Sequence, residues 1–154
     1  MELPPGLRLS VEDRPSPQDR EFINNALAEF NTAFLRDTTY ASFGIFVRDD
    51  AAALRAGLLG HAWAGWMFIA LLWVHGDLRR GGIGRGLMAE AERRAAAQGC
   101  HSAWVDTFSF QAPGFYKNLG YREFGRLDYK PEHQRIFLQK QLSAEQAVPN
   151  PAAR

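Results

Sequence analysis

The strongest constraint on the fold is the junction at residues 74–90, which reads VHGDLRRGGIGRGLMAE. An apolar run precedes it, a helical pattern follows it, and the turn between them concentrates glycines and arginines. A strand, a glycine-rich turn and a helix in this order place the unpaired first-turn amides of the helix around an anion. Glycines let the backbone approach closely, and Arg79, Arg80 and Arg85 add positive charge. The junction therefore predicts a site for a diphosphate or polyphosphate group.

The composition is that of one folded domain with no broad charge on its surface. The chain has 154 residues, of which 46% are hydrophobic, and its formal net charge is +1. We therefore expect neither nucleic acid nor membrane as a partner. The longest apolar run, residues 66–74, is far shorter than the about 20 residues of a membrane span. No signal-peptide pattern occurs at the N-terminus, so we expect a soluble, cytoplasmic protein.

We expect no nucleophilic role for the lone cysteine and no metal-binding role for His101 and His133. Cys100 stands where a helix gives way to a strand, a place that favours a small buried residue over a nucleophile. His101 and His133 lack metal-ligand spacing with any cysteine or acidic residue. We therefore expect no bound metal.

Hydrophobic periodicity predicts the element order β-α-β-β-β-α-β-α-β-β. The predicted strands span residues 7–11, 42–47, 54–63, 66–74, 101–106, 121–130 and 134–142; the predicted helices span 17–36, 83 to a stop at Gly99, and 113–119. This order predicts an α/β fold in which helices flank a central mixed, mostly antiparallel sheet. We expect one domain over residues 1–142 and a flexible tail over 143–154.

Three segments carry specific expectations. The helix over 17–36 has an apolar stripe at three-and-four spacing, which we expect to face the core. Its members are Phe22, Ile23, Ala26, Leu27, Phe30, Ala33 and Phe34. The unbroken apolar run 66–74 predicts a strand buried on both faces. Ala64-Gly65 predicts a tight hairpin between this strand and the preceding one.

Two phosphate-binding patterns can be tested against the junction. A P-loop requires GxxxxGK[ST], and no lysine or hydroxyl residue occupies those places. A dinucleotide-binding turn fits better, because residues 84–89 match GxGxxA and Asp106 follows about twenty residues later. Residues 75–82 nevertheless separate the strand from Gly84, whereas that fingerprint begins at the strand end. An NAD-type oxidoreductase stays as an alternative.

The segment LWVHGDLRRGGIGRGLM resembles the acyl-CoA pyrophosphate loop of the GNAT superfamily of N-acetyltransferases. Residues 79–84 match its Arg/Gln-x-x-Gly-x-Gly/Ala pattern without a gap. Downstream, FYKNLGY at 115–121 resembles the FYxxxGF segment of the family, and the element order over residues 7–142 matches as well. The longer segment TFSFQAPGFYKNLGYREFG resembles a bacterial subgroup of mostly unassigned substrate. Ser109 stands where many members carry asparagine.

The resemblance implies that acetyl passes from acetyl-CoA to a primary amine by direct attack in a ternary complex. It implies that Tyr116 acts as the general acid that protonates the departing CoA thiolate. Main-chain groups of Leu72, Trp73 and Val74 are expected to pair with the pantetheine arm. The pyrophosphate is expected at the loop formed by Arg79, Arg80, Gly81, Gly82, Ile83, Gly84, Arg85 and Gly86.

Several assignments stay open at this stage. The general base is not identified, with His61, His75, Asp106 and Glu123 as candidates. Trp63, Trp66 and Phe68 either line an acceptor pocket or pack in the core, and the core is favoured. A small-molecule acceptor is favoured over a protein, and a homodimer is a candidate assembly from family habit alone. A CoA-binding module without turnover is a further alternative.

Overall fold

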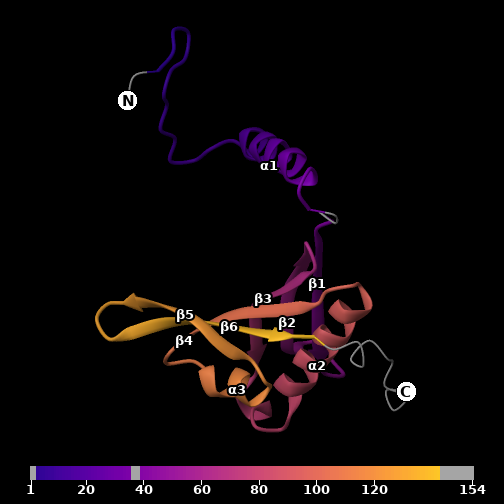
Figure 1. Ribbon diagram of the computed structural model, residues 1–154. Helices are drawn as coiled ribbons and strands as arrows, with labels where there is room; N and C mark the ends of the chain where they lie inside the picture. The colour runs from indigo at the N-terminus through magenta and orange to yellow at the C-terminus, as the bar shows by residue number, and fades with distance from the viewer. Residues whose placement is uncertain (1–2, 36–38, 143–154) are drawn as a thin grey trace. The chain divides into compact units, whose positions relative to one another are not determined.

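The computed structural model describes residues 3–35 and 39–142 (Figure 1). The chain divides into two compact units, Met1–Thr38 and Thr39–Arg154, and each is described here by itself. The tail predicted over residues 143–154 lies outside the described residues.

The first unit contains one helix, α1 (Pro17–Thr32). Its start is as predicted, because the Ser16 hydroxyl accepts a hydrogen bond from the Asp19 N–H at 3.0 Å and Pro17 occupies the first helical position. The helix ends at Thr32, earlier than predicted.

One prediction for this unit is wrong. Residues 7–11 form no strand, since a strand needs a neighbour for its backbone hydrogen bonds and five alternating residues do not supply one. The apolar stripe of α1 has no core inside this unit, because the described residues 3–35 contain no second helix or strand for α1 to pack against. The burial of this stripe stays a prediction.

The second unit is a six-stranded sheet with the strand order β1-β2-β3-β4-β6-β5. Its strands are β1 (Ala41–Arg48), β2 (Leu54–Trp63), β3 (Trp66–Val74), β4 (Ser102–Phe108), β5 (Arg122–Tyr129) and β6 (His133–Gln141). Only β3 and β4 pair in parallel, and the other neighbours are antiparallel. The predicted mixed, mostly antiparallel sheet is therefore confirmed.

Two helices and a short 3-10 turn complete this unit: α2 (Ile83–Ala97), α3 (Pro113–Asn118) and η1 (Gly76–Leu78). Figure 1 shows α2 and α3 on the same side of the sheet. The inner face of α2 buries Leu87, Met88 and Ala91, which belong to one core cluster with Leu58 of β2 and Met67 of β3. Cys100 is also buried in this cluster, as predicted.

The predicted hairpin between β2 and β3 is confirmed. Ala64 and Gly65 form its turn, with φ values of 49° and 78°, and positive φ at both central residues suits the right-handed twist of the strands.

A β-bulge interrupts this hairpin in the middle of β3. Gly60 opposes Ile69, whereas Leu59 opposes Leu71, so Ala70 is an extra residue on β3. The bulge brings the two backbones close together: a Cβ atom at Gly60 would lie 2.5 Å from the carbonyl oxygen of Phe68. Only glycine fits this position without a shift of the strands.

A buried ion pair joins α2 to the sheet. Lys140 Nζ of β6 lies 2.6 Å from Glu92 Oε2, and only 5% of the Glu92 side chain is exposed. We expect Lys140→Met to lower the free energy of unfolding by about 3 kcal/mol, because it leaves a buried carboxylate without its counter-ion. Arg93→Met is the matched control, since it removes the solvent-exposed Arg93–Glu90 pair on the same helix and should leave the free energy of unfolding nearly unchanged. Urea unfolding measures both values, and equal losses would contradict the prediction.

Candidate active site

The strands β3 and β4 separate in the middle of the sheet. Their pairing runs only from Trp66↔Ser102 to Ile69↔Val105, although both strands continue further. The bulge at Ala70 lies at the point where the pairing stops. Beyond it, the main chain of β3 faces a cavity of about 920 Å³ instead of β4. The separation leaves the β4-facing edge of β3 beyond Ile69 without a strand partner, as the expected pairing of residues 72–74 with a pantetheine arm requires.

The separation also corrects one sequence-based prediction. The apolar run of β3 is not buried on both faces throughout its length. Met67 and Ile69 are buried in the first half, but Leu71 is 62% exposed and Trp73 is 46% exposed in the second half. Leu71 and Trp73 alternate with Leu72 and Val74, which still pack against the core, so the second half of β3 is covered on one face only.

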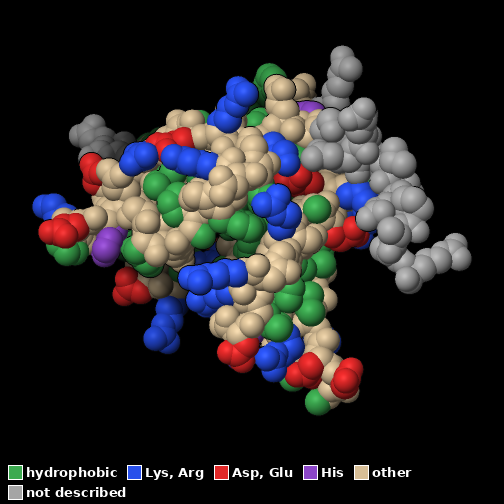
Figure 2. All heavy atoms as spheres, turned by 90° about the horizontal axis from the view of Figure 1, so that it is seen from below, with side chains coloured by type: hydrophobic (Ala, Val, Ile, Leu, Met, Phe, Trp, Pro, Cys, Tyr) green, Lys and Arg blue, Asp and Glu red, His purple; other side chains and the backbone are tan. Residues whose placement is uncertain are grey.

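The N-terminus of α2 borders this cavity. Gly82 precedes the helix with φ of 85°, and no side chain caps it. The helical hydrogen bonds begin with the N–H of Gly86, which donates to the carbonyl of Gly82 at 2.9 Å. The N–H groups before Gly86 in the first turn have no helical acceptor and carry the positive end of the helix dipole. Figure 2 shows a hollowed face with basic side chains around it.

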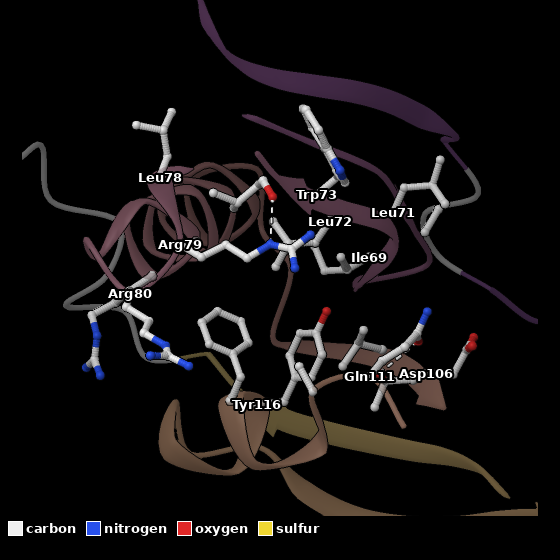
Figure 3. Close-up of a pocket in the computed structure, with 18 of the residues that line it drawn as sticks. Ile69, Leu71, Leu72, Trp73, Leu78, Arg79, Arg80, Asp106, Gln111 and Tyr116 are labelled. Carbon is white, nitrogen blue, oxygen red and sulfur yellow. Dashed lines mark hydrogen bonds between the residues drawn. The ribbon is translucent and has the colours of Figure 1, made fainter. Parts of the chain in front are cut away.

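Three arginines stand beside these amides. Arg79, Arg80 and Arg85 all line the cavity. The Nε of Arg79 donates to the carbonyl of Val74 at 3.1 Å, which ties the loop to the end of β3 (Figure 3). Arg80 has φ of 67°, a left-handed conformation that non-glycine residues seldom adopt. The loop thus combines free amides, a helix dipole and full positive charges, as an anion site requires.

Most of the predicted cofactor residues surround the cavity. Those that line it are Leu72, Trp73, Val74, Arg79, Arg80, Gly82, Gly84 and Arg85. Gly81, Ile83 and Gly86 do not line it. The Ile83 side chain packs instead against the hydrophobic core, and the Gly86 N–H is already used inside the helix.

Tyr116 reaches the same cavity from the opposite wall. It lies on α3, is only 7% exposed, and its hydroxyl points into the cavity (Figure 3). Burial raises the pKa of the Tyr116 phenol to about 12, and the negative charge of Asp106 adds to this effect. The phenol therefore keeps its proton at neutral pH and is available as a proton donor.

Of the four candidates for a general base, the structure brings Asp106 alone to the wall of this cavity. Glu123 pairs with Arg126 and Lys117, and the hydrogen bond from Arg126 is the main cause that lowers its pKa to about 2. His61 lies between the rings of Tyr40 and Phe68, where burial lowers its pKa.

His75 and the three aromatic residues of the hairpin also lie outside the lining of this cavity. The Nδ1 of His75 accepts from the N–H of Asp77 at 3.4 Å and caps η1. Phe68 stacks on Trp104 with ring centroids 4.1 Å apart, and Trp66 contacts His101 edge-on. Trp63 is 40% exposed at the end of β2.

Gln111 is a cavity residue that the sequence interpretation missed. Its Oε1 accepts from the Thr107 hydroxyl at 3.1 Å and from the Phe108 N–H at 2.9 Å. These bonds fix the amide, so its nitrogen is directed to the cavity (Figure 3). The only signal was its place in the segment TFSFQAPGFY, upstream of Tyr116. Ser109 of that segment lies outside this cavity and pairs with Gln134 of β6.

Within residues 3–35 and 39–142, no group of three or more His, Cys, Asp and Glu side chains is arranged to hold a metal ion. None of the helices in that part of the chain has the length and apolar character needed to cross a membrane.

Comparisons with known proteins agree on one family. The model of the acetyltransferase (GNAT) family matches residues 7–121. A blasticidin-S acetyltransferase from Streptomyces morookaense is 40% identical over 135 residues, which are 86% of this chain and 94% of that protein.

Solved structures match in fold. An acetyltransferase from Bacillus cereus has a TM-score of 0.76 and 30% identity, covering 86% of this chain and 98% of its own. A Bacillus anthracis protein described as a streptothricin acetyltransferase, solved with acetyl coenzyme A, has a TM-score of 0.58 and 16% identity over 66% of this chain and 62% of its own. Because the family model and the blasticidin-S acetyltransferase each match more than two thirds of the sequence, this chain belongs to the GNAT family of acetyltransferases.

Proposed function

We propose that the protein transfers an acetyl group from acetyl-CoA to a primary amine by direct attack in a ternary complex. One observation carries this proposal: a single cavity is bordered by the unpaired main chain of β3, the uncapped start of α2 and the Tyr116 hydroxyl. These three elements supply acceptors and donors for an extended amide chain, a site for a diphosphate, and a proton donor. Acetyl-CoA needs all three.

Different residues of the cavity would bind different parts of acetyl-CoA. The first-turn amides of α2, with Arg80 and Arg85, would hold the pyrophosphate by charge-assisted hydrogen bonds. The main chain of β3 beyond the bulge would pair with the pantetheine amides where β4 has moved away. An N–H of this segment would also stabilise the negative charge that develops on the thioester oxygen during attack.

Tyr116 would complete the transfer. Attack of the amine nitrogen on the thioester carbon breaks the carbon–sulfur bond and leaves the electron pair on sulfur. The phenol of Tyr116 faces the cavity and is protonated at neutral pH, so it would donate its proton to that sulfur. The phenolate would then recover a proton as the nitrogen loses its own, and the acetamide and free thiol are released.

The acceptor is proposed to be a small basic molecule. The blasticidin-S acetyltransferase matches this chain over most of both lengths, so blasticidin S is the first acceptor to test. Polyamines, amino acids and other amine-bearing antibiotics complete the panel.

Two measurements test the function. Acetyl-CoA and CoA should raise the melting temperature, because the start of α2 suits a pyrophosphate and the β3 main chain suits a pantetheine arm. NADH has no pantetheine arm and should not raise it. Thiol release from acetyl-CoA should then depend on the amine. Stabilisation by NADH alone would favour an oxidoreductase, whereas acetyl-CoA binding without thiol release for any amine would favour a non-catalytic module.

A further inference from the structure

The charged side chains that line the cavity are segregated at its two ends. Arg79, Arg80 and Arg85 lie at the end beside α2, and Asp106 is the single acid among the lining residues, all of which belong to the described part of the second unit. Figure 3 shows Arg80 on one side of Tyr116 and Asp106 on the other, while the Arg79 side chain extends across from Tyr116 to the carbonyl of Val74. The cavity thus has an end for an anion and an end for a cation.

We propose that Asp106 binds the ammonium group of the acceptor and makes the protein selective for cationic amines. The inference rests on the proposed acetyl transfer and adds to it the residue that recognises the acceptor. It assigns Asp106 a binding role rather than the role of a base.

The surroundings of Asp106 orient its carboxylate without occupying it. Asp106 lies on β4 just after the pairing with β3 stops at Val105. Arg135 of the neighbouring strand β6 donates from Nε to Oδ1 at 2.5 Å, and Arg135 does not line the cavity. No other hydrogen bond from the described residues reaches this carboxylate, so Oδ2 keeps its accepting capacity. Arg135 thus holds the carboxylate from outside the cavity wall.

The cavity gives an ammonium no other anionic partner. A charged amine that leaves water loses hydration, and this loss is unfavourable unless a hydrogen-bonded opposite charge replaces the water. The other polar side chains at this end, those of Thr107 and Gln111, are neutral. The side chain of Asp106 is 13% exposed, so its charge is less screened by water than that of a surface acid.

The position of Asp106 also fits the proposed order of acceptor binding, acetyl transfer and product release. Asp106 and Tyr116 line the same cavity, and the negative charge of Asp106 adds to the raised pKa of Tyr116. An amine bound at Asp106 therefore lies near the phenol of Tyr116, which is proposed to protonate the leaving thiolate. Before attack, the bound ammonium gives one proton to water, because only the neutral amine has an electron pair for the thioester carbon. The nitrogen loses its second proton after attack, and the resulting acetamide carries no positive charge, so the same carboxylate favours the substrate over the product and assists product release.

The test compares two acceptors of almost the same shape and different charge. Phenethylamine is a cation at neutral pH, whereas O-benzylhydroxylamine has an oxygen in place of one CH2 group and is neutral there. We expect wild type to have the higher kcat/KM for phenethylamine, and Asp106→Asn to lower the phenethylamine-to-O-benzylhydroxylamine ratio by about tenfold to a hundredfold. Where neither probe is acetylated, their inhibition constants against blasticidin S give the same ratio.

Three further variants separate binding from structure. Asp106→Glu should restore much of the preference for the cation. The double variant Asp106→Asn/Arg135→Gln removes both partners of the ion pair, so its ratio should also fall although no charge is left unpaired. Glu123→Gln is the matched control, because it neutralises an ion-paired acid outside this cavity, and its ratio should equal that of wild type.

The outcomes distinguish the two levels of the proposal. A wild-type enzyme that shows no preference for the cation, or an Asp106→Asn variant that keeps the wild-type ratio, would overturn the role of Asp106 while acetyl transfer stands. Failure of wild type to acetylate any amine, blasticidin S included, would overturn the proposed function and this inference with it.

Discussion

Replacing Gly84 with glutamate should lower the affinity for acetyl-CoA at least about a hundredfold, because a like charge placed against a phosphate is unfavourable by several kcal/mol. A Cβ atom at Gly84 would lie 3.4 Å from the Phe115 ring and 3.8 Å from a Val74 methyl group, and Gly84 lines the cavity. The added carboxylate would therefore occupy the space beside the first-turn amides of α2. Isothermal titration with acetyl-CoA measures the loss.

The matched control is Ala89→Glu on the same helix. Ala89 is exposed and does not line the cavity, so this variant adds the same charge to α2 outside the binding space. Its affinity for acetyl-CoA should stay within a few-fold of wild type. Wild-type affinity in a folded Gly84→Glu variant would show that the ligand does not bind at the start of α2.

Tyr116→Phe should lower kcat about a hundredfold to a thousandfold, while the affinity for acetyl-CoA stays nearly unchanged. The substitution removes only the hydroxyl, and the ring keeps its buried place beside Phe115. Steady-state rates of thiol release, together with a titration of acetyl-CoA, separate the two effects. An unchanged kcat in a folded variant would remove Tyr116 from the mechanism.

The pH dependence offers a second check on Tyr116. A general acid acts only while it is protonated, and the pKa of Tyr116 is raised to about 12. Its contribution should therefore persist through the alkaline range and decline only as the pH approaches 12. A fall in wild-type rate at lower pH has another origin and should appear in Tyr116→Phe as well. Tyr121→Phe is the matched control: Tyr121 is equally buried but does not line the cavity, so its loss should leave kcat near wild type.

Much of the sheet was predictable because local sequence patterns mark its strands and turns. The turn at Ala64-Gly65 and the strands over residues 42–47 and 54–63 were predicted from local patterns, and the structure confirms them. The strand expected at residues 7–11 failed because alternation over five residues says nothing about a pairing partner. The burial of the α1 stripe stays a prediction, since burial depends on what lies opposite a helix and periodicity does not contain that information.

The candidate site was predictable only in part. The glycine–arginine loop and Tyr116 stand in continuous motifs, so sequence alone drew attention to them. Asp106 could not be separated from the other three candidate bases, because its place at the cavity depends on where β3 leaves β4. That departure follows from a bulge, and the unbroken apolar run of β3 pointed instead to full burial.

The bulge in β3 depends on a residue of the neighbouring strand, Gly60. It lies on β2 and does not line the cavity, yet its missing side chain is what lets β2 come so close to Phe68 of β3. A single methyl group there would push against the β3 backbone just before Ala70, where the strand turns away from β4. We therefore expect Gly60 to influence the width of the cavity from one strand away. Mutational screens confined to ligand-contacting positions would overlook this determinant of cavity width.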